Sequence, residues 1–202
     1  TVLMEIERRT GKRVVELFDM VAGTSTGGIL AVGLTMPARA GRPEYTAPQY
    51  TAGDLRELYL QEAAAIFPQS LWGKALRPVA EKYSARGIEG VLQKFFGDSR
   101  LREALCDVLV TSYEIRLRQP WFFRSDRARL DPGYDFALWE VARATSAAPT
   151  YFPPARLGNG EWTLVDGGTF ANNPALIEKF LQVRMSGIAP LENYLYFVLA
   201  RQ

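Results

Sequence analysis

The 202-residue sequence contains no histidine and a single cysteine, Cys106. Without histidine, the chain lacks the most common general base, the most common metal ligand and every Ser-His or Cys-His pair. A lone cysteine excludes an intramolecular disulfide, which suits a reducing compartment and makes the cytoplasm the default expectation. Any nucleophile in this chain therefore needs a base other than histidine.

Strong charge imbalance and long apolar runs are also absent. The 24 Lys and Arg residues nearly balance the 22 Asp and Glu residues, so the net charge of +2 gives no reason to expect nucleic-acid binding. The stretch from Met20 to Met36 carries no charge, but it is shorter than the roughly 20 apolar residues that a membrane span needs. With 48% hydrophobic residues, residues 1–202 fit a single globular domain with a sizeable core.

Strand-like and helix-like segments alternate along the chain. Short β-rich runs indicate strands, and apolar residues spaced three or four apart indicate helices. The predicted strands cover residues 18–22, 107–113, 121–124, 164–165 and 194–200, and the predicted helices cover 2–10, 29–34, 55–66, 88–96, 136–144 and 175–185. Residues 37–48 and 68–78 are expected to be loops. This alternation predicts a layered α/β fold with a mainly parallel central sheet.

A glycine-flanked serine follows the first of these strands. Ser25 lies in Gly23-Thr24-Ser25-Thr26-Gly27, and small residues two before and two after a nucleophile permit a sharp strand-to-helix turn. If a helix starts at Thr26, its free backbone N–H can hold the oxyanion of a tetrahedral intermediate. A purely structural glycine turn and a phosphate cradle are the alternatives, although no Gly-Lys-Ser/Thr follows to favour the cradle.

Asp166 is the carboxylate in the most suggestive setting. It ends an apolar strand and is followed by Gly167 and Gly168, which let backbone or substrate come close. An aspartate of ordinary pKa is a poor base for a serine hydroxyl, so a dry, apolar site would have to raise its basicity. The alternative is a simple turn residue, because Asp-Gly-Gly is common in loops. Ser146 lacks flanking glycines, and we interpret it as a lining or capping residue.

Three motifs in order resemble the patatin-like phospholipases: FDMVAGTSTGG at 18–28, ARATSAAPTYFPP at 142–154 and LVDGGTFANNP at 164–174. The resemblance extends over nearly the whole chain. It implies a three-layer α/β/α fold in which Ser25 is the nucleophile and Asp166 is its base. It also implies hydrolysis of acyl esters of phospholipids or related lipids through an acyl-enzyme, without a metal or cofactor.

One departure from the family concerns the oxyanion hole. Members of the family carry a glycine-rich segment, roughly D-G-G-G-x-R-G, before the first helix, and this sequence begins after that point. We therefore expect residues 1–202 to lack that segment, and to end at Gln202 before the family's usual C-terminal end. Loss of a principal oxyanion donor costs on the order of 100- to 1000-fold in rate, so we expect the chain alone to be impaired.

The expected function is a lipid acyl hydrolase of the phospholipase A type that works at a membrane surface. Aromatic and basic character that suits contact with anionic headgroups is combined in Trp72, Lys74, Arg77, Lys82 and Arg86, although an ordinary solvated surface explains them at least as well. A soluble-ester hydrolase or an acyltransferase is the alternative among enzymes, because an acyl-enzyme can pass its acyl group to water or to another alcohol. A catalytically silent lipid-binding module is the alternative outside enzymes.

Overall fold

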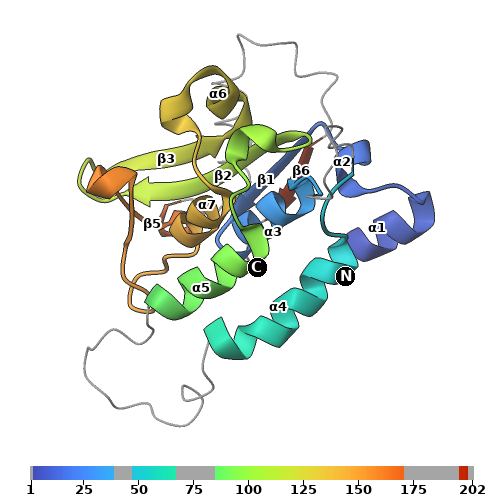
Figure 1. Ribbon diagram of the computed structural model, residues 1–202, viewed down its shortest axis with the longest axis horizontal. Coiled ribbons are helices and arrows are strands. Elements are labelled where there is room, and N and C mark those ends of the chain that lie inside the picture. The colour runs from blue at the N-terminus through green and yellow to red at the C-terminus, as the bar shows by residue number, and fades with distance from the viewer. Residues whose placement is uncertain (1, 39–46, 67–84, 171–195, 200–202) are drawn as a thin grey trace.

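The computed structural model describes residues 2–38, 47–66, 85–170 and 196–199, and the strands in these ranges form one sheet (Figure 1). The strands are β1 (Met20–Thr24), β2 (Asp107–Glu114), β3 (Gln119–Arg124), β4 (Ala155–Leu157), β5 (Trp162–Asp166) and β6 (Tyr196–Leu199). β2 is central because it pairs with β1, β3 and β5. β1 also pairs with β6, and β5 also pairs with β4.

The pairing registers place two strands end to end along one edge of β2. β3 pairs with residues 109–114 of β2, β1 pairs with residues 107–111, and β5 pairs with residues 112–114. Because a strand has only two edges, β3 occupies one edge of β2 while β1 and β5 share the other. β1 runs parallel to β2 and β5 runs antiparallel, so their carboxyl ends meet at the neighbouring residues Thr111 and Ser112.

The α/β fold predicted from the sequence is confirmed, with a mixed sheet. Within the described residues, β1 makes parallel pairs with β2 and β6, whereas β2–β3, β2–β5 and β4–β5 are antiparallel. Short connections account for two of the antiparallel pairs, because a parallel pair needs a crossover of a dozen or more residues. The β4–β5 connection contains Gly158, Asn159 and Gly160, all with positive φ, which is a hairpin signal that the sequence carried.

The helices among the described residues are α1 (Val2–Thr10), α2 (Val14–Leu17), α3 (Thr26–Thr35), α4 (Ala52–Ile66), α5 (Ala85–Phe96), α6 (Ser125–Leu130) and α7 (Leu138–Thr145). α3 lies against β1, β2 and β6 and packs beside α7. α7 in turn contacts α5, and α5 contacts α4, so that these four helices lie on the same side of the sheet in Figure 1.

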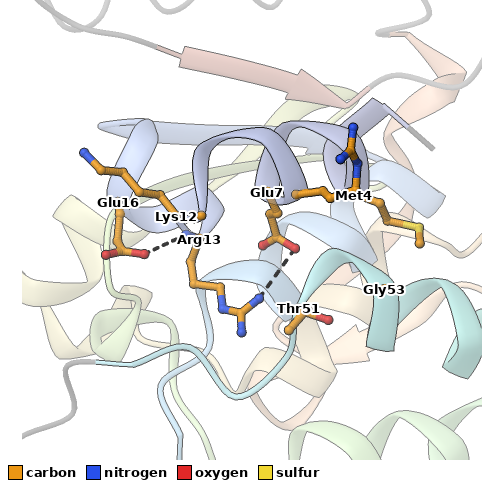
Figure 2. Close-up of a pocket in the computed structure, with 9 residues that line it drawn as sticks. Met4, Glu7, Lys12, Arg13, Glu16, Thr51 and Gly53 are labelled. Carbon is orange, nitrogen blue, oxygen red and sulfur yellow. Dashed lines mark hydrogen bonds and ion pairs between the residues drawn. The ribbon is translucent and has the colours of Figure 1, made fainter.

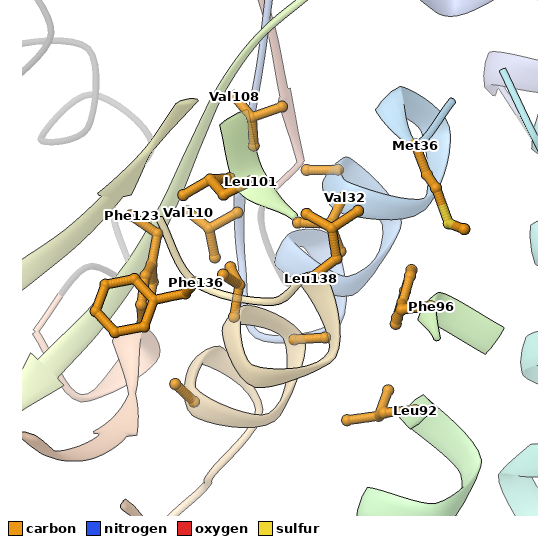
Figure 3. Packing of buried hydrophobic residues seen from close by; sticks show 14 of the residues in the cluster. Val32, Met36, Leu92, Phe96, Leu101, Val108, Val110, Phe123, Phe136 and Leu138 are labelled. Carbon is orange, nitrogen blue, oxygen red and sulfur yellow. The ribbon is translucent and has the colours of Figure 1, made fainter. Parts of the chain in front are cut away.

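The hydrophobic core fills the space between the sheet and these helices (Figure 3). α5 contributes one apolar stripe, in which Ile88, Leu92 and Phe96 recur every four residues and are buried. α3 differs because it is apolar on nearly all sides, as expected of a helix enclosed by a sheet and other helices. Most of the core side chains labelled in Figure 3 come from the sheet and from α3, α5 and α7, among them Val32, Phe96, Val108, Val110, Phe123 and Leu138, and Phe136 joins them from the segment just before α7.

Most of the predicted elements are found within one or two residues of their predicted bounds. α4 begins with a capping box, in which Thr51 N donates to Asp54 Oδ2 at 2.8 Å and Asp54 N donates to Thr51 Oγ1 at 3.0 Å. α7 begins at Leu138, two residues later than predicted. The predicted loop at 68–78 and helix at 175–185 lie outside the described residues, as does part of the predicted loop at 37–48.

Candidate active site

Ser25 occupies a sharp turn between β1 and α3. Its backbone has φ 57° and ψ −127°, an uncommon conformation for a residue that carries a side chain. Such a conformation costs about 1–3 kcal/mol and persists only where the surrounding structure enforces it. β1 ends at Thr24 and α3 starts at Thr26, so Ser25 alone separates the strand from the helix, as in the nucleophile turns of serine hydrolases.

The glycines of the motif are required by close backbone contacts around this turn. A Cβ atom on Gly23 would lie 2.2 Å from Gly27 O, and one on Gly27 would lie 2.1 Å from Leu199 O. A Cβ atom on Gly28 would lie 2.7 Å from Thr145 Cγ2. The first helical turn of α3 therefore sits directly against β1, β6 and α7, which no larger residue would permit.

Asp166 is brought to Ser25 by the end-to-end arrangement of β1 and β5. Thr24 is paired with Thr111, and Asp166 is paired with the next residue of β2, Ser112. Neighbouring residues of a strand are separated by only about 3.3 Å along it, so the residue after β1 and the last residue of β5 come together. Ser25 Oγ donates a hydrogen bond to Asp166 Oδ2 at 2.6 Å, a length typical of a hydroxyl donating to a carboxylate.

Asp166 is held by hydrogen bonds to both its carboxylate and its backbone. The carboxylate Oδ1 accepts a hydrogen bond from Gly168 N at 2.7 Å, and the backbone N–H of Asp166 donates to Ala147 O at 3.0 Å. Thr169 Oγ1 donates to Asp166 O at 2.8 Å. A Cβ atom on Gly167 would lie 2.2 Å from Thr111 Oγ1, so the turn after Asp166 also packs tightly on β2. The carboxylate thus faces Ser25 in a fixed orientation.

Both members of the pair are nearly removed from solvent, with exposed fractions of 9% for Ser25 and 5% for Asp166. This burial is the dry setting that the sequence argument required of a carboxylate base. Thr26 is the first residue of the ten-residue helix α3, and Gly28 N and Ile29 N donate to Ser25 O. The Thr26 N–H therefore belongs to the positively polarised end of a helix at the serine.

Sequence reasoning missed Thr145, the last residue of α7. Its Oγ1 accepts a hydrogen bond from Ser25 N at 2.9 Å and donates one to Thr111 O at 2.7 Å. Its signal in the sequence was slight: a polar residue in the alanine-rich run before Pro149. The neighbouring Ser146 is buried, and its Oγ donates to Ala142 O at 2.7 Å, which agrees with the capping interpretation.

The segment that follows α7 is fixed by a buried arginine. Arg143 is 2% exposed, and its guanidinium donates to Pro153 O at 2.8 Å and to Glu89 Oε1 of α5 at 3.2 Å. Burial lowers the pKa of Arg143, while the charge of Glu89 and its hydrogen bond oppose that shift. Arg143 thus ties residues 143–153, which include Ala147 beside Asp166, to the helical layer.

A separate pocket of about 400 Å³ lies between α1, α2 and the start of α4 (Figure 2). Two of its charged side chains form an ion pair, with 3.8 Å between Arg13 Nη1 and Glu7 Oε2, and the Glu16 carboxylate accepts a hydrogen bond from Arg13 N at 2.6 Å. α2 precedes the amino end of β1 and Thr51 follows the carboxyl end of α3, so this pocket lies at the opposite ends of these elements from Ser25. It contributes nothing to the Ser25 site.

The comparison with known families gives a match to a sequence model described as patatin-like phospholipase over residues 2–178. The chain belongs to the patatin-like phospholipase family. Among its relatives, patatin-like protein 1 of Arabidopsis thaliana is 36% identical over an alignment of 178 positions, which covers 82% of this chain and 42% of that protein. Patatin-like protein 4 of the same plant is 33% identical over 98% of this chain and 52% of its own length. The resemblance inferred from three motifs is thereby confirmed.

Two further comparisons give another curated relative and a solved structure. A Solanum tuberosum relative named probable inactive patatin-3-Kuras 1 is 30% identical over 91% of this chain and 49% of its own length. The crystal structure of VipD from Legionella pneumophila covers 85% of this chain and 44% of VipD at 14% identity, with a TM-score of 0.40. The patatin-like chain spans about half the length of the curated relatives it matches. The assignment to the family rests on the sequence matches.

Within the described ranges, the helices are too short or too polar to cross a bilayer. Four of the residues considered for headgroup contact, Trp72, Lys74, Arg77 and Lys82, lie outside the described residues, and the fifth, Arg86, belongs to the first turn of α5.

Proposed function

We propose that this patatin-like chain is a lipid acyl hydrolase of the phospholipase A type, with Ser25 as nucleophile and Asp166 as general base. The observation that carries the proposal is the 2.6 Å hydrogen bond from Ser25 Oγ to Asp166 Oδ2 at a strained, glycine-flanked turn. Membership of the family supports action on acyl lipids. We further infer that residues 1–202 belong to one acyl hydrolase domain, because the described strands join one sheet over one core.

The proposed reaction has two halves that share one proton carrier. In the first, Asp166 takes the proton of Ser25 Oγ, which attacks the ester carbonyl, and the tetrahedral intermediate carries its negative charge on the former carbonyl oxygen. The Thr26 N–H, at the positive end of α3, donates to that oxygen. When the intermediate collapses, the alcohol leaves with the proton from Asp166 and the acyl group remains on Ser25.

In the second half, Asp166 takes a proton from water, and the resulting hydroxide attacks the acyl-enzyme. Collapse of this intermediate releases the fatty acid and returns the proton to Ser25 Oγ, so the enzyme is regenerated with no redox change. Because the same carboxylate acts in both halves, it must be oriented before substrate arrives. The bonds from Gly168 N to Asp166 Oδ1 and from Asp166 N to Ala147 O support that requirement.

Two other functions keep support from particular facts. An acyltransferase or soluble-ester hydrolase would use the same serine and base, with a different acceptor or a shorter acyl ester. A catalytically silent lipid-binding module is the other candidate, since one relative is itself named probable inactive. The proposed partners are an acyl lipid and the membrane surface that presents it. We do not propose nucleic acid as a partner.

Turnover of phosphatidylcholine vesicles, with and without an added alcohol, separates these functions. The proposal predicts free fatty acid and lysophospholipid as products in wild type and neither product in Ser25→Ala. Formation of a new ester with the added alcohol would favour an acyltransferase. Vesicle binding without any product, by a protein whose Ser25 does not react with a fluorophosphonate, would favour the silent module.

A further inference from the structure

The Thr145 side chain bridges the nucleophile turn and the central strand. Its Oγ1 accepts from Ser25 N at 2.9 Å and donates to Thr111 O at 2.7 Å, so one hydroxyl uses its single proton and one lone pair in defined directions. Thr145 and Thr111 are both fully buried, with 0% exposure. Neither hydrogen bond can be replaced by bulk water without rearrangement of the packed core.

The position of this bridge follows from the way the chain leaves the sheet. The β1–β2 ladder ends at the pair Thr24 and Thr111, and Ser25 turns away from the sheet with φ 57°. A buried backbone N–H at such a turn needs a new acceptor, because a lost partner costs about as much as a hydrogen bond. The Thr145 hydroxyl lies between the Ser25 N–H and the Thr111 C=O and satisfies both groups.

The same short segment also holds the other member of the dyad. Two residues after Thr145, Ala147 O accepts the hydrogen bond from Asp166 N at 3.0 Å. The Thr145 Cγ2 atom, in turn, is one of the atoms that a Cβ on Gly28 would meet, at 2.7 Å. Residues 145–147 at the end of α7 therefore touch the backbone of both Ser25 and Asp166.

We propose that Thr145 is a positioning residue, whose hydroxyl holds the Ser25 backbone so that Ser25 Oγ stays within hydrogen-bond reach of Asp166. This inference rests on the proposed function, because it assigns a task to Thr145 only if Ser25 is the nucleophile. Thr145 touches no reacting atom. Its effect passes through the Ser25 backbone, so its loss changes the rate of acylation and leaves substrate binding unchanged.

Two matched pairs of variants isolate the hydroxyl. Thr145→Val replaces the hydroxyl by a methyl group of similar volume, and Thr145→Ser keeps the hydroxyl but removes the methyl group. Thr145→Ala differs from Thr145→Ser only by the hydroxyl. Because alanine is smaller than valine, Thr145→Ala also avoids any steric clash in the buried site and replaces Thr145→Val in the comparison if Thr145→Val fails to fold. We expect kcat to fall about 10- to 100-fold in Thr145→Val and Thr145→Ala, because small misplacements of reacting groups cost that much.

The assay measures kcat and KM on a short soluble p-nitrophenyl ester, together with the rate of Ser25 labelling by a fluorophosphonate, for protein shown to be folded by circular dichroism. KM should stay within about twofold of wild type in every variant, and Thr145→Ser should keep kcat within about threefold. Thr35→Val is the control, because Thr35 is equally buried on α3 and its hydroxyl donates within its own helix, to Ala31 O at 2.8 Å and to Val32 O at 3.4 Å. It should lower stability without changing kcat.

The outcomes separate this inference from the proposed function. Folded Thr145→Val and Thr145→Ala that match Thr145→Ser in kcat and labelling rate would overturn the role of Thr145 while leaving the dyad in place. Wild-type protein that is not labelled at Ser25 would overturn both proposals together. A fall in kcat for Thr35→Val as large as that for Thr145→Val would also overturn the inference, because any lost buried hydroxyl would then have the same effect.

Discussion

Replacement of Asp166 by asparagine removes the proposed base with little change of shape. In the structure the carboxylate has two separate tasks: Oδ1 accepts from Gly168 N at 2.7 Å, and Oδ2 accepts from Ser25 Oγ at 2.6 Å. In Asp166→Asn, the amide oxygen can keep the bond to Gly168 N, and the amide nitrogen then faces Ser25 Oγ. That nitrogen can only donate, so it cannot accept the serine proton.

The expected loss follows from the size of general-base catalysis. Such catalysis is worth about 100- to 10,000-fold, which corresponds to roughly 3–5 kcal/mol of activation free energy. The stability change should be smaller, about 1 kcal/mol, because one hydrogen bond to a charged group is exchanged for a neutral one. Asp166→Asn should therefore be folded, with kcat and fluorophosphonate labelling lowered by at least about 100-fold.

Asp135→Asn is the matched control for this experiment. Asp135 is also a buried aspartate, and its carboxylate accepts hydrogen bonds from Arg100 Nε at 2.7 Å and from Arg102 N at 3.1 Å. It lies just before the start of α7, whereas Thr145, which contacts Ser25, lies at the other end of that helix. This variant should lower the melting temperature and leave turnover unchanged. Labelling of Asp166→Asn within about threefold of wild type would refute the reasoning and direct the search to another carboxylate.

Two further predictions test the packing of the fold. Gly27→Ala should lower the free energy of unfolding by at least about 2 kcal/mol, because the new Cβ atom would lie 2.1 Å from Leu199 O. Gly90→Ala, on the open side of α5, should instead raise the free energy of unfolding by up to about 1 kcal/mol. Urea unfolding of both variants checks this contrast. Burial, followed by the nearby charge of Asp107, raises the pKa of the Cys106 thiol from 9.0 to about 12, so native protein at pH 8 should react with a disulfide reagent far more slowly than unfolded protein. The same pKa shift should lower the free energy of unfolding as pH rises from about 9 to 12, because the thiol of the unfolded chain ionises first. Equal rates of reaction with the disulfide reagent in native and unfolded protein would contradict the raised pKa of Cys106.

The sequence predicted the local features of this protein better than its long-range geometry. The helix over residues 2–10, the strand over 107–113 and the glycine-flanked turn at Ser25 each depend on residues close together in the chain, and all are present. Ser25 and Asp166 were selected because histidine is absent and because three motifs resembled one family. Their contact distance could not be predicted, because it depends on the register by which β1 and β5 meet along β2.

The features that sequence reasoning missed share this long-range origin. Nothing near Thr145 in the sequence indicates that its hydroxyl contacts a residue 120 positions away. The mixed character of the sheet was likewise missed, although the Gly158–Gly160 turn carried a hairpin signal. Among the described strands, both parallel pairs involve β1, which is buried along its whole length as is typical of a strand within a parallel part of a sheet.

The central claim is that Ser25 is the nucleophile, and covalent labelling tests it most directly. Wild-type protein and Ser25→Ala are treated with a fluorophosphonate, digested and mapped by mass spectrometry. The account predicts one adduct, on the peptide that contains Ser25, and no adduct in Ser25→Ala. An adduct on a different residue, or equal labelling of both proteins, would contradict it.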